Sequence, residues 1–339
     1  MTEELPPIPA RTLPLAATSP GKCIVFGEHA VVHGAPELVF ALDLETQVFV
    51  RAADVTRLNG SPRAVDEHPY FARALSSMWA EGPPIDVRAV SRIPRSAGLG
   101  SSAAFVAALA AALGAATGGI DRATLAGRSF EIERGAQGVG SPGDTTAVVG
   151  GGFLSINGGS GAPLWTVENG DRVWQVRRVT DPGWVWVVAH SGIPRSTADA
   201  VRAVAARLER ADGPTLLAEF RQVAEDGMRA VDHADRTAVA ELLRRNHELL
   251  REVGVSHPRL EELLAAAAPA AEGGKLTGAG AGGSIVLLPI PGKETELVRR
   301  LARAGGLAFV VRPSTEGAAL IEPGAEGGVP GLTSGTRSE

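Results

Sequence analysis

Residues 94–104 read Pro-Arg-Ser-Ala-Gly-Leu-Gly-Ser-Ser-Ala-Ala, and this stretch decides the fold. Its glycines let backbone N–H groups approach an anion without a Cβ in the way, and the alanine-rich run that follows predicts a helix. A helix that begins near Ser101 turns unpaired amides and the positive end of its dipole toward the loop. Ser101 is a candidate cap, and Ser102 can reach a metal ion held between phosphates. The segment predicts a nucleotide phosphate loop; the alternative is a loop that only caps a core helix.

Two known phosphate-binding signatures do not fit this stretch. A Walker A loop needs Gly-Lys followed by Ser or Thr, and none of the three Gly-Lys pairs in the chain is followed by either. A dinucleotide fingerprint is matched literally by Gly98, Gly100 and Ala103, with Asp121 about the right distance beyond. That fingerprint needs a strand that ends at the acidic residue, whereas Asp121 follows an alanine-rich helix and a turn. A second literal match, at 278–283, leads into a predicted strand instead of a helix.

A third signature, P-x-x-x-G-L-G-S-S-A-A, fits at every fixed position and resembles the phosphate loop of the GHMP small-molecule kinases. Residues 20–34, Pro-Gly-Lys-Cys-Ile-Val-Phe-Gly-Glu-His-Ala-Val-Val-His-Gly, resemble the opening motif of the mevalonate-kinase branch of that family. Residues 275–284 resemble its third, glycine-rich motif, with Ala281 where glycine is more usual. Residues 141–146 resemble the aspartate-bearing loop in its short, archaeal-type form, and residues 192–197 a segment at the substrate end. The resemblance spans about residues 18–290.

This resemblance implies an α+β fold of two domains with the active site between them. The expected N-terminal domain, residues 18–180, has ribosomal S5 domain 2-like topology and binds ATP. The expected C-terminal domain, residues 181–322, is ferredoxin-like. Residues 1–17 form an N-terminal extension, and residues 323–339, rich in Gly, Ser and Thr, are predicted to be disordered.

Hydrophobic periodicity adds the expected elements. Strands are predicted over residues 23–26, 44–52, 85–91, 147–156, 184–189, 284–288 and 308–312. Helices are predicted over residues 68–80, 101–116, 121–135, 197–211, 214–232, 236–253, 258–268 and 294–304.

Phosphoryl transfer from ATP needs charge neutralisation around the γ-phosphate and a positioned hydroxyl nucleophile. The resemblance places the catalytic aspartate at Asp144, in a loop constrained by Gly and Pro, and Lys22 beside it; the alternative for Asp144 is an Asx-turn residue. Glu133 lies eleven residues before Asp144, the spacing that the family uses for its Mg²⁺ ligand, with Ser102 as the second ligand; alternatively Glu133 is a paired surface residue. The resemblance assigns ATP binding to Pro94, Arg95, Ser96, Ala97, Gly98, Leu99, Gly100, Ser101, Ser102 and Ala103.

Further residues are assigned by the same resemblance to the substrate. Glu28 and His29 match positions near the acceptor, with a structural loop network as the alternative. Thr197, and less directly Ser196, are expected to hydrogen-bond the acceptor, whereas Arg195 is equally consistent with a surface charge at a helix start. Asp144 and the glycine-rich block, at Gly280, complete the expected substrate-binding residues.

Lysine usage supports one of these assignments independently of any family. The chain has three lysines and thirty arginines. A lysine in such a chain indicates a position that needs a compact ammonium instead of a planar guanidinium. Lys22 is the stronger case, because it lies beside the strand that leads into Gly-Glu-His. Lys275 is either functional or a charge at a strand mouth, and Lys293 is typical of a solvated turn.

Composition limits the class of protein. A length of 339 residues and a hydrophobic content of 44% indicate a two-domain globular protein. One cysteine excludes an internal disulfide and favours the cytoplasm. No run of residues is long and apolar enough to cross a bilayer, and an early Glu pair with scattered prolines argues against a secretory signal. A net charge of −5 without a basic stripe argues against nucleic acid as a partner. The expected partner is a small-molecule substrate, and a homodimer is left open.

The resemblance therefore implies ATP- and Mg²⁺-dependent phosphorylation of the 5-hydroxyl of (R)-mevalonate. The alternatives are another GHMP kinase, for phosphomevalonate or a sugar, and a catalytically silent homologue that binds a ligand as a regulator. His29 and His33 have the i, i+4 spacing of metal ligands, but no H-E-x-x-H pattern or third ligand accompanies them. No Gly-x-Ser-x-Gly elbow accompanies a histidine, which disfavours a serine hydrolase.

Overall fold

The computed structural model describes residues 5–138, 140–159, 162–194 and 197–323. Its elements in chain order are β1 (Ile8–Pro9), β2 (Leu15–Phe26), a 3₁₀ turn (Ala30–His33), β3 (Glu37–Ala52), β4 (Arg57–Leu58), α1 (Ala64–Glu67), α2 (Pro69–Met78), β5 (Ile85–Ser91), α3 (Ser101–Ala116), β6 (Gly119–Ile120), α4 (Arg122–Gln137), α5 (Gly143–Gly150), β7 (Phe153–Ile156), β8 (Trp165–Asn169), β9 (Arg172–Val179), β10 (Trp186–His190), α6 (Thr197–Leu208), α7 (Gly213–Asp232), α8 (Arg236–Glu252), α9 (Pro258–Ala267), β11 (Ala271–Thr277), β12 (Ser284–Pro289), α10 (Glu294–Arg303), β13 (Leu307–Val311) and β14 (Ala319–Ile321).

The larger sheet is built on two long antiparallel strands, β2 and β3. Within the described ranges, its order is β14-β2-β3-β7-β9-β8, with β5 also paired to β3 and β4 paired to β5. Residues 37–40 of β3 pair with β7, and residues 46–52 pair with β5. The register of β2 against β3 shifts between Pro20 and Gly21, which is where a strand tolerates proline. The shift directly precedes Lys22, whose strand pairs with the centre of β3.

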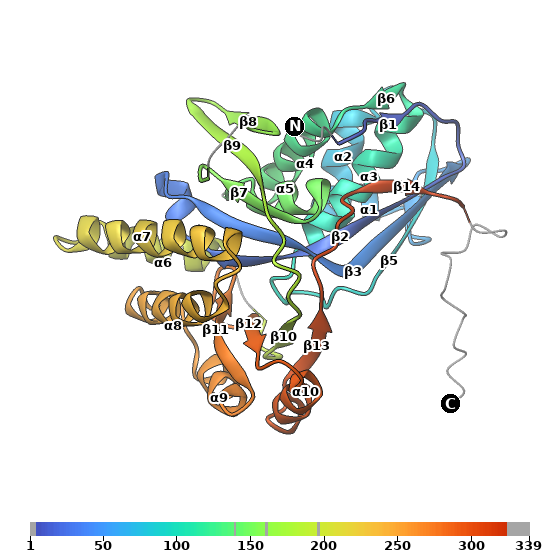
Figure 1. The fold of residues 1–339 in the computed structure, drawn as a ribbon. Coiled ribbons are helices and arrows are strands. Elements are labelled where there is room, and N and C mark those ends of the chain that lie inside the picture. The colour runs from blue at the N-terminus through green and yellow to red at the C-terminus, as the bar shows by residue number, and fades with distance from the viewer. Residues whose placement is uncertain (1–4, 139, 160–161, 195–196, 324–339) are drawn as a thin grey trace.

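Helix α3 is the core of the first domain. Every residue from Ala103 to Ala115 is buried, as expected for a helix that is apolar on all sides. It packs on β2 and β3 and contacts α4 and α5, and Figure 1 shows α2 to α5 gathered on one side of this sheet. The phosphate loop therefore leads into a helix that is buried over most of its length, which fixes the position of that helix's N-terminus.

The smaller sheet lies in the second domain and is antiparallel. Its described strands run in the order β11-β12-β10-β13, and α8 and α9 pack on β11 while α10 packs on β13. Figure 1 shows this sheet with α8, α9 and α10 below the first domain. Two packed α/β units agree with the predicted α+β fold and with a ferredoxin-like second domain.

Some predicted elements differ from the observed ones. The sequence predicts a strand region over residues 147–156, but residues 147–150 belong to α5 and only β7 is a strand. Gly151 and Gly152, which have φ of +66° and +64°, end the helix and turn the chain into β7. Strands β8, β9 and β11 were not predicted. Two consecutive glycines, Gly273 and Gly274, weaken the strand pattern of β11. In the structure β11 pairs with β12, with a register shift between Ala271 and Gly273.

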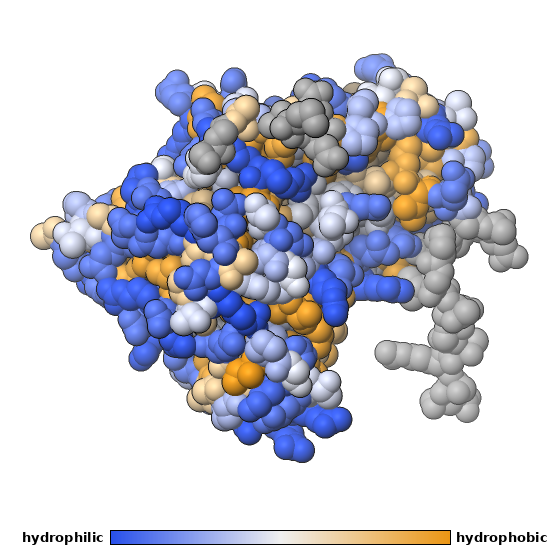
Figure 2. All heavy atoms as spheres, viewed as in Figure 1, coloured by the Kyte–Doolittle hydropathy of each residue, from blue (hydrophilic) through white to orange (hydrophobic). Residues whose placement is uncertain are grey.

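Both ends of the described chain return to the first domain. β1 pairs with β6, so strand pairing begins before the expected domain limit at residue 18. β14 lies within the expected second domain, residues 181–322, but pairs with β2 of the first domain. The predicted disordered tail lies outside the described residues from residue 324 onward. None of the described helices has the length and apolar content needed to cross a bilayer. Figure 2 shows a mainly hydrophilic face with hydrophobic residues in separate groups.

Candidate active site

The loop between β5 and α3 has a backbone suited to an anion. Gly98 and Gly100 both have φ of +78°, in the left-handed region that favours glycine, and Gly100 is the N-cap residue of α3. No side chain of the described chain caps this helix end. The prediction that Ser101 caps α3 was wrong, because Ser101 is already the first helical residue. The first amides of α3 are therefore left for a ligand oxygen.

This loop lines a cleft of about 820 Å³. The predicted ATP-binding residues on the cleft wall are Pro94, Arg95, Ser96, Ala97, Gly98, Gly100, Ser101 and Ser102. Leu99 and Ala103 are fully buried in the core instead, and the backbone carbonyl of Leu99 accepts a hydrogen bond from the Lys22 amide at 2.9 Å. These two residues anchor the loop, while their neighbours face the cleft.

Lys22 and Asp144 form an ion pair at the floor of the cleft. The Lys22 Nζ lies 2.8 Å from the Asp144 Oδ1, with the lysine side chain 1% and the aspartate side chain 35% exposed. β2 supplies the lysine, and the first turn of α5 supplies the aspartate. A Cβ on Gly100 would lie 2.6 Å from the Lys22 Cγ, so the phosphate loop packs directly on the lysine stem. The arrangement holds an ammonium and a carboxylate next to a phosphate-binding loop.

Glu133 lies beside the phosphate loop in a small polar network. Ser102 donates a hydrogen bond from Oγ to the Glu133 Oε1 at 2.7 Å, and Gln137 donates to the same oxygen at 3.1 Å. The amide of Gln137 also contacts the Tyr70 hydroxyl at 3.2 Å. Burial, and after it the nearby Asp144 charge, raises the pKa of Glu133 to about 7. A buried carboxylate with a neighbouring hydroxyl is a pair of hard oxygen donors that suits Mg²⁺.

Glu28 and His29, in the loop after β2, also line the cleft. His29 has φ of +64° and its Nε2 lies 3.1 Å from the Ala279 carbonyl, which ties it to the glycine-rich block. The Glu28 Oε1 accepts a hydrogen bond from Lys275, and the Glu28 Oε2 is buried without a hydrogen-bond partner among the described residues. A hydroxyl group of a bound ligand could donate a hydrogen bond to this carboxylate oxygen.

The structure also decides between the two interpretations of Lys275. Its side chain is fully buried and pairs with Glu28 across the two domains, so it is not a charge at a strand mouth. Its Nζ also donates to the Leu276 carbonyl at 2.7 Å. Burial raises the pKa of Glu28, and the Lys275 ammonium opposes that shift. Lys275 therefore holds Glu28 in place.

One predicted substrate residue does not line the cleft, and others are not fully described. Gly280 does not line it; a Cβ there would lie 2.3 Å from the Val255 carbonyl, so its lack of a side chain serves packing. Arg195 and Ser196 lie outside the described residues. Thr197 is the first residue of α6, but its side chain is not among those described. Val201, one turn later, does line the cleft.

Sequence reasoning missed several residues that line the cleft. Tyr70 and Gln137 support Glu133, and neither belongs to a recognisable motif. Glu37 lines the cleft as well and is 1% exposed. The sequence did contain a signal for Glu37: it directly precedes the apolar run 38–42, and an acid next to a buried strand is unusual.

Comparison with known proteins gives matches over both domains. The family model described as GHMP kinases N terminal domain matches residues 67–152, and the model described as GHMP kinases C terminal matches residues 228–307. The first match contains the phosphate loop, Glu133 and Asp144. The second contains Lys275 and the glycine-rich block.

Similar proteins cover nearly the whole chain. A mevalonate kinase from Archaeoglobus fulgidus is 31% identical over 91% of this chain and 100% of its own length. A mevalonate kinase from Pyrococcus horikoshii is 31% identical over 90% of this chain and 97% of its own. The crystal structure of the L. major mevalonate kinase in complex with R-mevalonate has a TM-score of 0.75 at 21% identity and covers 90% of this chain and 99% of that one. The solved structure supports the fold, and the sequence relatives support the family.

Proposed function

The chain belongs to the GHMP kinase family, and on that premise we propose that it is a mevalonate kinase. It transfers the γ-phosphate of ATP to the 5-hydroxyl of (R)-mevalonate and yields 5-phosphomevalonate and ADP. One observation carries this proposal: the Lys22–Asp144 ion pair lies in the same cleft as the phosphate loop and Glu28. A phosphate donor site and an acceptor site thus meet at one carboxylate.

ATP occupies the phosphate-loop side of the cleft in this proposal. The backbone around Gly98 and Gly100 and the open N-terminus of α3 bind its phosphates. The Lys22 ammonium contacts the γ-phosphate and counters the charge that develops during transfer. Because Lys22 is buried against Gly100, its ammonium is held in place before ATP binds.

Asp144 is the proposed base of the transfer step. Its carboxylate accepts the proton of the mevalonate 5-hydroxyl as that oxygen forms a bond to the γ-phosphorus. The bond from the γ-phosphorus to the bridging oxygen of ADP breaks in the same step, and ADP leaves with the electron pair. Lys22, paired to Asp144 at 2.8 Å, orients the carboxylate toward the mevalonate hydroxyl.

Ser102 and Glu133 are the proposed Mg²⁺ ligands. Burial of the Glu133 carboxylate, with a serine hydroxyl at 2.7 Å as its neighbour, fits a hard divalent cation. Bound Mg²⁺ would neutralise phosphate charge during the transfer. Gln137 donates to the same Glu133 oxygen as Ser102 and also contacts the Tyr70 hydroxyl, so Gln137 and Tyr70 are expected to orient this carboxylate.

Mevalonate is placed between the Asp144 carboxylate and the Glu28–His29 loop. The partnerless Oε2 of Glu28 accepts a hydrogen bond from an acceptor hydroxyl, and Thr197 contributes from the start of α6. A buried polar group that loses its partner costs about 1–3 kcal/mol, so two or three such contacts give strong discrimination between acceptors. We place the protein in the cytoplasm, which suits its free, buried Cys23.

An ADP-release assay over a small panel of acceptors tests this function. The panel contains mevalonate, phosphomevalonate, galactose and homoserine at equal concentration with MgATP. We expect the highest kcat/KM with mevalonate. A higher value with phosphomevalonate or the sugar would assign the chain to another branch of the family, and no turnover with any of the four would favour a silent, ligand-binding homologue.

A further inference from the structure

Glu37 is a buried acid in the active site that the proposed reaction does not use. It is the first residue of β3 and is 1% exposed. Its Oε2 accepts a hydrogen bond from the Ser141 hydroxyl at 3.2 Å, and Ser141 belongs to the loop that carries Asp144. Glu37 is also one of the residues that line the cleft. It therefore lies behind the catalytic loop and next to the reacting groups.

Gly143 leaves the space that the Glu37 carboxyl occupies. A Cβ built on Gly143 would lie 2.1 Å from the Glu37 Oε2, far closer than two such atoms can approach. Gly143 is not among the residues with positive φ, so its backbone does not require glycine. A side chain at this position would force the buried Glu37 carboxyl to move. The Glu37 carboxyl occupies the space that is left by the missing side chain of Gly143. Gly143 directly precedes Asp144 along the chain.

The charges around Glu37 favour its neutral form. Lys22 pairs with Asp144, and Lys275 pairs with Glu28, so the described residues supply no ion-pair partner to Glu37. Burial first, and then the Asp144 and Glu28 charges, raise the pKa of Glu37 to about 8; the Lys22 ammonium and the Ser141 hydroxyl oppose that shift. Four groups face Glu37: Lys22 on β2, Glu28 in the loop after β2, Ser141 in the loop before α5, and Asp144 in the first turn of α5.

We propose that Glu37 is a positioning residue for Asp144: its uncharged carboxyl fills the space beside Gly143 and fixes the catalytic turn against Lys22. When Glu37 loses its proton, its carboxylate adds a negative charge beside Asp144. This carboxylate then competes with Asp144 for the Lys22 ammonium. It also repels the γ-phosphate that must approach the same floor. Turnover therefore falls as Glu37 ionises. This inference rests on the proposed function, because turnover is read through that reaction.

The pH dependence of turnover tests the charge half of this inference. ADP release is measured with saturating mevalonate and MgATP from pH 6 to pH 9.5 for the wild type, Glu37→Gln and Glu131→Gln. Glu131 lies on α4 with its side chain 58% exposed and is the control. We expect wild-type and Glu131→Gln kcat to fall above pH 8, approaching about tenfold per unit, as for loss of one proton.

Glutamine has no proton to lose at this position. Glu37→Gln, scaled to its own value at pH 7, should therefore stay within about twofold up to pH 9. A decline in Glu37→Gln that matches the wild type would overturn the inference, and so would a wild type without a decline.

The packing half is tested by a double-mutant cycle without substrate. Thermal unfolding is measured for Glu37→Ala, Gly143→Ala and the double variant. We expect Gly143→Ala to lower the melting temperature, because its methyl group collides with the carboxyl, and we expect Glu37→Ala to relieve that loss in the double variant. Additive shifts would contradict the inference. Because this cycle needs no turnover, it separates a failure of the Glu37 inference from a failure of the mevalonate assignment.

Discussion

The Nζ of Lys22 on β2 lies 2.8 Å from the Oδ1 of Asp144 in the first turn of α5. The two residues are far apart in sequence, and only the packing of α5 on β2 brings them together. The lysine is buried and the aspartate is partly exposed toward the cleft. The pair is therefore fixed at its cationic end and accessible at its carboxylate end, which suits a base that must reach a bound hydroxyl.

Replacing Asp144 with asparagine removes the proposed base but keeps its size. We expect Asp144→Asn to lower kcat by about 10²–10⁴. ATP affinity should change little, because the phosphate loop and α3 stay in place. Steady-state kinetics and nucleotide titration measure the two quantities. Turnover close to wild type would remove Asp144 from the mechanism.

Replacing Lys22 with arginine keeps the charge but not the shape. The guanidinium is planar and larger, and the Lys22 stem is packed against Gly100. A misplacement of about 1 Å near the reacting atoms costs on the order of 10²-fold in rate, so we expect a loss of that size in Lys22→Arg.

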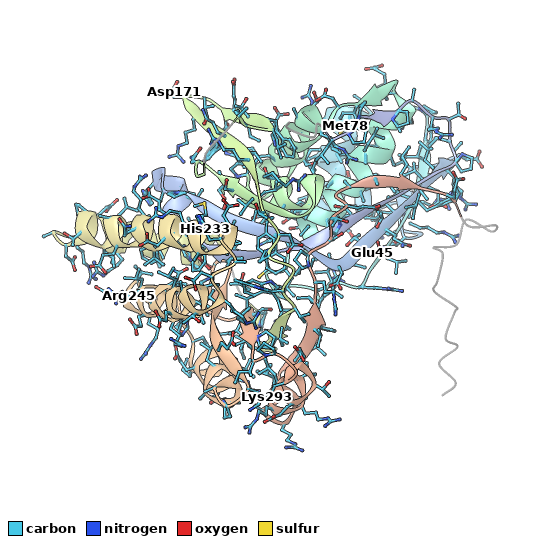
Figure 3. All side chains as sticks on the ribbon, in the orientation of Figure 1. Glu45, Met78, Asp171, His233, Arg245 and Lys293 are labelled. Atoms are coloured by element: carbon cyan, nitrogen blue, oxygen red, sulfur yellow. The ribbon has the colours of Figure 1, made fainter. Side chains whose placement is uncertain are left out.

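Lys293→Arg is the matched control, because Lys293 is half-buried in the turn before α10, outside the residues that line the cleft. Figure 3 places it at the far end of the second domain. Equal, near wild-type kcat in both variants would reduce Lys22 to a general electrostatic contact.

A methyl group on Gly100 should damage the site more than the fold. Gly100 and Gly254 have φ of +78° and +80°, so alanine is strained by about 1–2 kcal/mol at either position. A Cβ at Gly254 meets open space, whereas one at Gly100 meets the Lys22 Cγ at 2.6 Å. We expect similar losses of stability in the two variants, measured by chemical denaturation, but at least a tenfold loss of kcat only in Gly100→Ala. A similar kcat loss in Gly254→Ala would show that strain alone is responsible.

Breaking the buried Glu28–Lys275 pair should destabilise the protein. Lys275→Met leaves the Glu28 carboxylate buried without its cation, which costs about 3–5 kcal/mol of unfolding free energy. Adding Glu28→Gln removes the unpaired charge, so the double variant should recover part of this loss. Urea denaturation of the two single variants and the double variant measures the coupling. An unchanged midpoint in Lys275→Met would contradict a structural role for the pair.

Glu37 should make the ligand-free protein less stable as pH rises. Its pKa is about 8 in the folded protein against an ordinary value of 4.5. Between these values the folded state keeps a proton that the unfolded chain has released, so its stabilising contribution decreases with rising pH. The slope is on the order of 1 kcal/mol per pH unit for one such group.

Glu133, with a pKa of about 7, acts in the same direction over part of this window, so the wild type alone does not isolate Glu37. Denaturation of the wild type and Glu37→Gln at pH 5, 6.5 and 8 isolates Glu37. The free energy of unfolding of Glu37→Gln, relative to that of the wild type, should increase with pH. A constant difference would contradict the raised pKa.

The chain alone determined the phosphate loop, the helix after it and the family. A loop that binds phosphate through its own amides needs contiguous residues, so residues 94–104 carry the whole pattern. The boundaries of α3 were predicted correctly for the same reason, since an alanine-rich run bounded by glycine and threonine is a local signal. The three lysines also pointed to Lys22, because a rare residue type is visible without a structure.

Only the tertiary structure decided which charges meet. Glu28 and Lys275 are joined by a contact between domains, and Glu37 is buried against Gly143 by the packing of β3 on α5. Burial and neighbouring charge set the pKa values of Glu37 and Glu133, and neither quantity is a property of a residue's place in the chain. Local patterns fix what a segment can form, whereas long-range packing fixes the environment in which its side chains react.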